Sequence, residues 1–301
     1  MKCMKWIGKV AEDIWMKKLS IFELKCIAAF CMVLDHAGEY LALPIVCRYL
    51  GRLAIPIFIF CCVQGCLHTT NKKRYLLRLY IAGICMSFFD AWAQISVNFF
   101  RTLFSIALLI FLYEWYRETK AKKIWVYYIL WQIFTTFLCY LTAVIPWIDL
   151  ENIGVYVLPA VFGNLFFLEG GVFYVFVGLW FYYARDDLKK LSIGYVILVF
   201  GFVFGLQSNP YLVYGLLPKI KMLGMIGEAA YDFFEEILGN WFLCVGVLYY
   251  ESIADNYQWM MIGALPVLWM YNGTKGRSGK WFFYLFYPVH CIIFYCIGQI
   301  L

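Results

Sequence analysis

Long apolar stretches dominate the chain and are separated by short polar or basic segments. The stretches do not alternate polar and apolar residues as the strands of a barrel would, so each one predicts a helix. Crossing a bilayer requires about 20 mostly apolar residues in a helix. The pattern predicts membrane-spanning helices at about residues 21–43, 46–67, 75–97, 99–116, 124–145, 171–184, 191–206, 237–250, 259–271 and 281–298.

The middle of the chain departs from this regular pattern. Residues 154–184 are too many for one upright span and include Pro159, Gly163 and the pair Gly170–Gly171. We therefore expect a re-entrant or interfacial piece before the span at 171–184. Residues 208–236 mix prolines with charges, and a further crossing within 211–227 would raise the count from about ten to about eleven spans. The predicted fold is an all-α polytopic membrane bundle over residues 21–301. The sequence does not decide between about ten and about eleven spans.

Composition and charge agree with a membrane protein. Hydrophobic residues make up 64% of the 301 residues and charged residues 15%. Soluble domains have about 45–50% apolar residues and about 25% charged residues. Basic residues cluster near 72–78, 117–123, 185–190 and 275–280. Such clusters are typical of cytoplasmic loops under the positive-inside rule and not of a nucleic-acid surface. Residues 1–20 are basic, with apolar residues at helical spacing. They predict either an amphipathic segment on the cytoplasmic membrane surface or a solvated tail.

Cysteines are frequent but show no pattern of a disulfide or metal framework. The sequence has 12, and nearly all lie inside apolar segments, where they are expected to act as small hydrophobic residues. We expect no bound metal. The sequence also lacks a Walker loop, a dinucleotide-binding glycine fingerprint and a Gly-x-Ser-x-Gly elbow, which excludes the common nucleotide-binding and serine-hydrolase classes.

Ionisable residues within predicted spans are costly and are therefore candidates for function. In the first span, His36 lies next to Asp35 and one turn before Glu39. On a helix, Glu39 shares the face of His36, whereas Asp35 points about 100° away. A neutral imidazole beside a carboxylate can serve as a general base near neutral pH. A buried histidine that only ties helices together fits the pattern equally well.

Two arginines follow in the second predicted span. Arg48 and Arg52 are four residues apart, which places both guanidinium groups on one helix face. Their partners would be Asp35, Glu39, or the phosphate or oxyanion of a ligand. Snorkelling to the membrane surface is the alternative, and it suits Arg48 better than Arg52.

Two further motifs contain polar groups. The basic stretch from His68 to Arg78 is first of all a positive-inside loop, but its cations would also suit a polyanionic cofactor such as coenzyme A. In the last span, Pro288 comes two residues before His290. A proline there frees a backbone carbonyl and kinks the helix, as often happens at sites inside membranes.

Several motifs, which follow one another along the chain, resemble those of the TraX family of bacterial inner-membrane proteins. The namesake of this family acetylates the N-terminus of conjugative pilin. The similarity extends over most of the chain and is densest over residues 24–104 and 266–295. The motifs are Leu24 to His36, Gly51-Arg52-Leu-Ala-Ile-Pro56-Ile-Phe58, His68-Thr-x-Asn71-x-x-x-Tyr75-Leu-Leu-Arg78, Asn98-Phe-Phe-x-Thr102-Leu-Phe104 and Phe286-Tyr287-Pro288-Val-His290. More distantly, the chain resembles membrane acyltransferases that acetylate surface polysaccharides.

The resemblance implies a multi-pass protein of the bacterial cytoplasmic membrane, with its N-terminus in the cytoplasm. It would transfer acetyl from cytoplasmic acetyl-CoA to an amine or hydroxyl of a peptide or cell-surface glycan. His36 would be the catalytic base, with Arg52 near it and Asp35 or Glu39 orienting it. Coenzyme A would be bound by Arg48, His68, Asn71, Lys73, Arg74 and Arg78, and the substrate cavity would include Asn98, Tyr287 and His290. Residues 146–236 depart from the family pattern, which leaves acceptor recognition open.

Two other function classes are compatible with the same residues. In a transporter or flippase, Asp35, His36 and the arginines would form a proton or substrate relay. In a non-enzymatic membrane assembly factor or immunity protein, they would only hold helices together. The sequence does not indicate the acceptor, the acyl chain length or the oligomeric state.

Overall fold

The structure is a computed structural model that describes residues 18–144, 151–207, 225–235, 237 and 256–300. Within these residues the regular structure is helical, apart from one isolated bridge between Leu19 and Tyr271. The predicted all-α class is therefore confirmed. The basic N-terminal segment predicted for residues 1–20 lies almost wholly outside the described residues.

Six helices in the described part of the chain are long and apolar enough to cross a membrane. Their bounds are Val46–His68, Lys72–Ala93, Phe99–Thr119, Lys123–Ala143, Leu188–Gln207 and Trp281–Gly298. Each coincides with a predicted span. The count of ten or eleven is not confirmed. The possible crossing in 211–227 and the span at 237–250 fall almost entirely outside the described residues, and 171–184 and 259–271 form shorter helices.

The chain divides into two compact units. The first comprises the described parts of Met1–Cys61, Asp186–Val196 and Tyr257–Leu301, and the second those of Cys62–Arg185 and Ile197–Asn256. The boundary falls inside α4 (Ala54–His68) and inside α10 (Leu188–Phe200).

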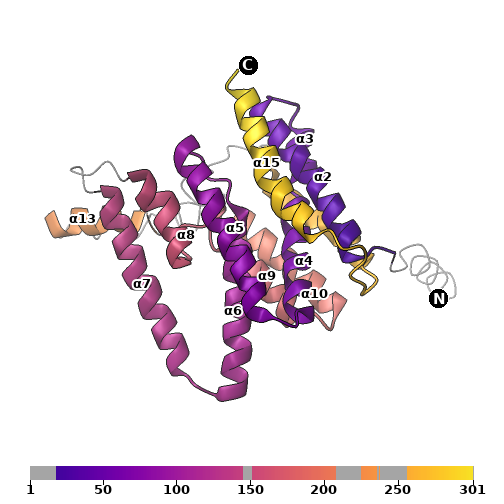
Figure 1. Ribbon diagram of the computed structural model, residues 1–301, viewed down its shortest axis with the longest axis horizontal. Helices are drawn as coiled ribbons and strands as arrows, with labels where there is room; N and C mark the ends of the chain where they lie inside the picture. Colours follow the sequence, from indigo (N-terminus) through magenta and orange to yellow (C-terminus); the bar gives the residue numbers. More distant parts are fainter. Residues whose placement is uncertain (1–17, 145–150, 208–224, 236, 238–255, 301) are drawn as a thin grey trace. The chain divides into compact units, whose positions relative to one another are not determined.

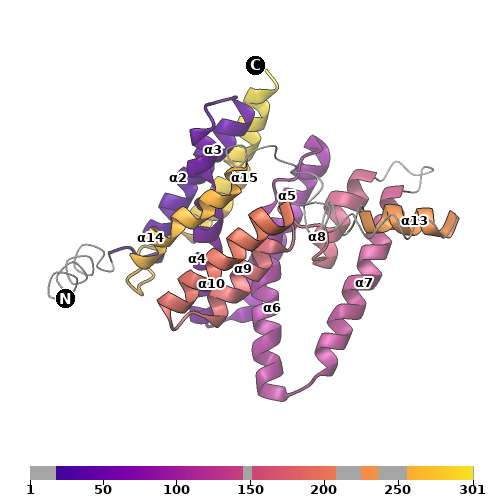
Figure 2. The ribbon, with the colours of Figure 1, turned by 180° about the vertical axis from the view of Figure 1, so that it is seen from behind.

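The first unit is built around α2 (Ile21–Tyr40). A capping box begins this helix, because Ser20 accepts a bond from the Glu23 amide while the Glu23 carboxylate accepts from the Ser20 amide at 2.6 Å. Figures 1 and 2 show α3 (Val46–Gly51) and α15 (Lys280–Gly298) packed alongside α2. The unit also contains the short η4 (Tyr257–Ala264) and α14 (Leu265–Trp269), together with its parts of α4 and α10.

The helix α2 is not among the six apolar helices, because charged residues lie toward both of its ends. Its 20 residues include Glu23, Lys25, Asp35 and Glu39. The helix predicted at 21–43 is thus present, and its crossing of the membrane stays a prediction. The next predicted span is interrupted at Arg52 and Leu53, where α3 ends and α4 begins. Pro56 lies in the first turn of α4, where a missing backbone N–H costs no helix bond.

The second unit contains α5 (Lys72–Ala93), α6 (Phe99–Thr119) and α7 (Lys123–Val144). The helices α5 and α6 pack together, and α6 also packs against α9 (Phe173–Tyr183). Figure 1 shows α6 and α7 diverging from the turn that joins them. The remaining described elements of the unit are η1 (Ile153–Val157), α8 (Leu158–Phe162), η2 (Gly201–Gln207) and α13 (Met225–Phe234).

The break predicted within 154–184 is confirmed. The short helices η1 and α8 end at Gly163, and an irregular segment leads to α9, which has 11 residues. Gly163, Gly170 and Gly171 have positive φ angles of 62°, 67° and 71°. These left-handed conformations favour glycine, and they allow the chain to turn twice between two short apolar helices.

Candidate functional site

Buried polar side chains of the first unit gather where α2, α3 and α15 meet. Asp35 and His36 come from α2, Arg52 directly follows α3, and His290 comes from α15. All four side chains are buried. The predicted grouping of His36 with Arg52 thus occurs within a single compact unit.

Asp35 is the centre of an ionic cluster. Arg52 Nη2 donates to Asp35 Oδ2 at 2.7 Å, and Arg48 Nη1 lies 3.2 Å from Asp35 Oδ1. Arg48 Nη1 also donates to the Asp35 carbonyl at 3.0 Å and to Glu39 Oε2 at 2.7 Å. Asp35 and Glu39 were two of the partners expected for these arginines. Two guanidinium groups balance two carboxylates, which lowers the cost of burying Asp35 and Arg52, whereas the Glu39 side chain is 44% exposed.

Two small features shape this ionic cluster. A Cβ atom on Gly51 would lie 2.3 Å from Asp35 Cβ, so the close approach of α3 to α2 requires glycine there. Tyr257 of η4 covers the arginines, since their Cζ atoms lie 5.0 Å (Arg48) and 4.8 Å (Arg52) from its ring centroid. Arg48 Nη2 also donates to the Tyr257 hydroxyl at 2.9 Å. The phenol ring and hydroxyl therefore fix both guanidinium groups.

His36 faces α15 rather than the carboxylates. Its Nδ1 lies 3.3 Å from Cys291 Sγ, and its ring stacks on that of His290 with centroids 4.9 Å apart. The Tyr287 ring centroid is 6.3 Å from that of His36. The carboxylates of Asp35 and Glu39 instead contact the arginines. Arg52 and Arg48 both remain within electrostatic range of His36.

The hydrogen bonds of His290 indicate its tautomer. His290 Nδ1 lies 2.8 Å from the carbonyl oxygen of Phe286, which can only accept, so Nδ1 carries the proton and donates. This leaves His290 Nε2 unprotonated in the neutral ring, 3.7 Å from Cys291 Sγ. The nitrogen, nitrogen and sulfur atoms of His36, His290 and Cys291 all lie within 4.8 Å of one another. This trio, called the His-Cys cluster below, has the atoms for proton transfer, for nucleophilic attack or for metal binding.

Sequence reasoning missed Cys291. It treated the cysteines of apolar segments as packing residues, and Cys291 is fully buried in an apolar helix. The one available signal was its position next to His290 in a proline-containing span.

The residues expected to bind coenzyme A, except Arg48, lie at or near the start of α5 in the second unit. His68 ends α4, and Asn71 caps α5 by accepting from the Arg74 amide at 2.8 Å. Lys73 and Arg74 are exposed in the first turn of the helix. The Arg78 guanidinium lies over the Tyr75 ring, 5.8 Å from its centroid. Exposed cations at a helix N-terminus form a positive site, which suits a phosphate group.

The second unit also contains buried polar residues that sequence reasoning overlooked. Asp90 of α5 and Arg101 of α6 are buried, and Asp90 lies within electrostatic range of Arg101. Asn98, predicted to line a substrate cavity, donates to Gly83 O at 2.7 Å and Ser87 Oγ at 2.8 Å, and so links α6 to α5. Asp90 and Arg101 each carry charge within an apolar stretch, which is the same signal that identified Asp35.

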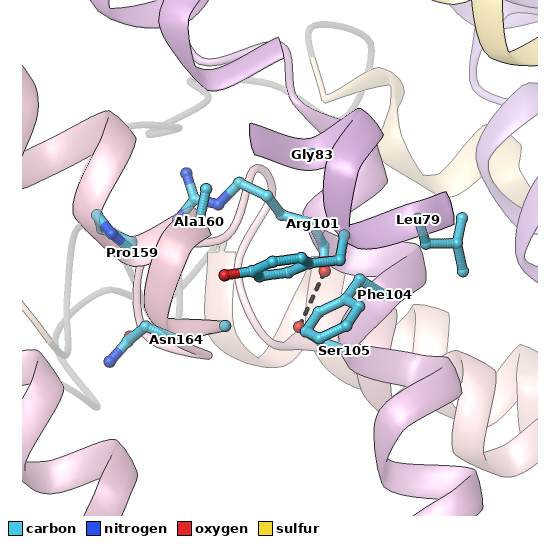
Figure 3. A pocket seen from close by; sticks show the side chains of 10 residues that line it. Leu79, Gly83, Arg101, Phe104, Ser105, Pro159, Ala160 and Asn164 are labelled. Atoms are coloured by element: carbon cyan, nitrogen blue, oxygen red, sulfur yellow. Dashed lines mark hydrogen bonds between the residues drawn. The ribbon is translucent and has the colours of Figure 1, made fainter. Parts of the chain in front are cut away.

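A hollow of about 220 Å³ lies beside Arg101. Figure 3 shows the Arg101 side chain running along it, with Ser105 Oγ bonded to the Arg101 carbonyl at 2.9 Å. The Arg101 guanidinium donates to the Phe167 carbonyl. The bond from the Arg101 guanidinium to the Phe167 carbonyl favours a structural role for this arginine.

The sequence model of the TraX protein family matches residues 20–158. Over this segment the chain is similar to the TraX family. The TraX segment covers less than half of the 301 residues and runs from α2 to the end of η1. It includes His36, Arg48 and Arg52, whereas the predicted similarity over 266–295, with His290, lies outside it.

Part of the chain is also similar to a fimbrial assembly protein. The chain is 35% identical over 82 residues to the probable fimbrial assembly protein FimC, serogroup H1, of Dichelobacter nodosus. The alignment covers 24% of this chain and 32% of that protein, so the chain spans about a third of the length of this relative. No solved structure matches the chain.

Proposed function

We propose that this protein is a membrane-bound acyltransferase that moves acetyl from acetyl-CoA to an amine or hydroxyl of a pilin-like peptide or a surface glycan. The observation that carries the proposal is the burial of His36, whose ring contacts Cys291 and His290 and lies within electrostatic range of Arg48 and Arg52. The similarity to the TraX family and the fimbrial assembly name of the relative fit a role in modifying or assembling pilin.

His36 is the proposed base. Acyl transfer to an amine or hydroxyl requires removal of a proton as the new bond forms, and imidazole is suited to this near neutral pH. The neighbouring rings of Tyr40, Tyr287 and His290 hold the imidazole in place. Burial excludes water, which would otherwise compete with the acceptor for the acyl group.

The arginines are the proposed electrostatic partners of the reaction. Negative charge develops on the carbonyl oxygen in the tetrahedral transition state, and fixed positive groups stabilise it. Arg52 is held in place by Asp35 and by the Tyr257 ring, so little reorganisation is needed during the reaction. Asp35 acts here by positioning the guanidinium group, and the orienting role predicted for it toward His36 remains a prediction.

The start of α5 is the proposed binding region for the coenzyme A phosphates. Lys73 and Arg74 are exposed and stand where the free amides of the helix N-terminus add partial positive charge. Lys72, by contrast, is paired with Glu114 at 2.8 Å. The exposed pair is therefore the better candidate for a phosphate ligand.

Removal of the base gives the direct test. Purified protein in lipid nanodiscs is incubated with radiolabelled acetyl-CoA and purified pilin. His36→Ala should lower the transfer rate at least about 100-fold, the usual contribution of a general base. The matched control is Phe30→Ala, because Phe30 lies on the same helix with 64% of its side chain exposed. Full transfer by His36→Ala would contradict the proposal.

A non-enzymatic assembly factor is the second candidate, favoured by the name of the relative. In that case the wild-type protein would release no coenzyme A from acetyl-CoA. His36→Ala would then still support pilus assembly, provided that the variant folds. Measuring coenzyme A release and pilus assembly with the same variants distinguishes the two functions.

A further inference from the structure

We propose that Cys291 carries the acyl group as a thioester between donor and acceptor. The inference rests on the proposed acyl transfer and adds a covalent intermediate to it. It makes Cys291 a catalytic residue, with His36 serving as its base before serving the acceptor.

The geometry is that of a nucleophile beside its base. Cys291 Sγ lies 3.3 Å from His36 Nδ1, within hydrogen-bond distance for sulfur. On the other side, His290 Nε2 is 3.7 Å from the sulfur, and its ring is fixed by the bond to Phe286. The Cys291 thiol can lose its proton to the His36 imidazole, and the unprotonated His290 Nε2 is a second acceptor on its other side.

Another buried cysteine illustrates the contrast. Cys62 Sγ lies 3.5 Å from the Leu103 carbonyl and 3.4 Å from the Tyr75 hydroxyl. Neither group is a base of suitable strength near neutral pH. The contact with imidazole nitrogens is thus what distinguishes Cys291 from a packing cysteine such as Cys62.

The first step exchanges one thioester for another. His36 Nδ1 takes the Cys291 proton, and the sulfur attacks the carbonyl carbon of acetyl-CoA. The new carbon–sulfur bond forms, the bond to the coenzyme A sulfur breaks, and the imidazolium returns its proton to that leaving thiolate. No oxidant or reductant is needed, and the energies of the two thioesters are similar.

The second step releases the acyl group to the acceptor. The acceptor nitrogen or oxygen attacks the Cys291 thioester, the carbon–sulfur bond breaks, and His36 takes the acceptor proton. That proton then returns to the Cys291 sulfur. Coenzyme A can leave before the acceptor binds, which suits a donor and an acceptor on opposite sides of a membrane.

Access to the sulfur requires movement of its neighbours, because Cys291 is fully buried. Pro288, three residues earlier, removes one backbone hydrogen bond from α15. Helices deform most readily at such a position. Burial also protects the thioester from hydrolysis while the acceptor is absent.

Metal binding is the competing interpretation of the same three atoms. The His36 and His290 rings are nearly parallel, with an angle of 16° between their planes and centroids 4.9 Å apart. Nitrogen lone pairs lie in the ring planes, so parallel stacked rings direct them along separate planes rather than toward one ion. The geometry therefore favours sulfur chemistry over a shared metal.

Trapping the intermediate tests the proposal. The full chain in nanodiscs is incubated with radiolabelled acetyl-CoA without acceptor, quenched in acid and digested for mass spectrometry. Wild type should carry one acetyl group on the peptide containing Cys291, and neutral hydroxylamine should remove it. Cys291→Ala should lose both this label and transfer to the acceptor. Cys296→Ala, an exposed cysteine five residues further along α15, should behave as wild type.

The remaining outcomes overturn the proposal in distinguishable ways. Transfer by Cys291→Ala at the wild-type rate would exclude the intermediate and leave the acyltransferase function intact. If wild type shows neither label nor transfer, the proposed function fails with it. Stoichiometric zinc in wild type that is absent from Cys291→Ala, without acyl label, would establish a metal site instead. Should Cys291→Ala not fold, Cys291→Ser supplies the test, since its oxygen ester would resist neutral hydroxylamine.

Discussion

At the scale of single residues, the pairing of Asp35 with Arg52 shows what the sequence can predict. Charged groups in apolar spans must find partners, so Asp35 and Glu39 were expected as partners of the arginines, and the structure shows these pairs. Cys291 could not be identified in this way. It is separated from His36 by 255 residues in sequence, and its local pattern matches that of the packing cysteines.

We expect the Asp35–Arg52 pair to contribute to the stability of the fold. Arg52→Met leaves the buried Asp35 carboxylate with Arg48 as its remaining arginine partner, so the free energy of unfolding should fall by about 3 kcal/mol. Thermal unfolding in detergent measures this loss. The double variant Asp35→Leu/Arg52→Met removes both charges and should recover much of the stability without recovering transfer. An unchanged melting temperature in Arg52→Met would show that the pair does not stabilise the fold.

At the scale of elements, apolar runs predicted most helices but not their interruptions. The span at 46–67 was predicted as continuous, and the break at Arg52 and Leu53 was not. Arg52 keeps helical backbone angles and bonds to the Arg48 carbonyl, so the spacing of the two arginines still places both on Asp35. The predicted break near Gly170 and Gly171 was confirmed because glycine pairs mark turns directly.

Gly51 allows a test of the contact between α2 and α3. In Gly51→Ala, the new Cβ would lie 2.3 Å from Asp35 Cβ and 2.6 Å from Asp35 Oδ1, so the helices must separate. We expect a loss of about 2 kcal/mol in unfolding free energy and a parallel loss of transfer. The control is Gly263→Ala, whose Cβ would meet Leu53 at an ordinary 3.5 Å. If both variants have the melting temperature of the wild type, the close approach of α3 to α2 does not stabilise the fold.

At the scale of the whole molecule, composition indicated the membrane class and the motifs indicated a similarity to the TraX family over residues 20–158. The matched TraX segment supplies His36 and the arginines, whereas His290 and Cys291 come from a helix beyond its end at residue 158. The cluster in the first unit therefore combines residues from both ends of the chain. Neither the span count nor the acceptor follows from composition.

The most direct test of the central claim is made in cells. Host cells lacking the protein are complemented with wild type, His36→Ala or Phe30→Ala, and pilin and surface glycans are analysed by intact-mass spectrometry. With wild type and Phe30→Ala, one of these polymers should be heavier by one acetyl group, and with His36→Ala this group should be missing. An acetyl group restored equally well by His36→Ala would contradict the account.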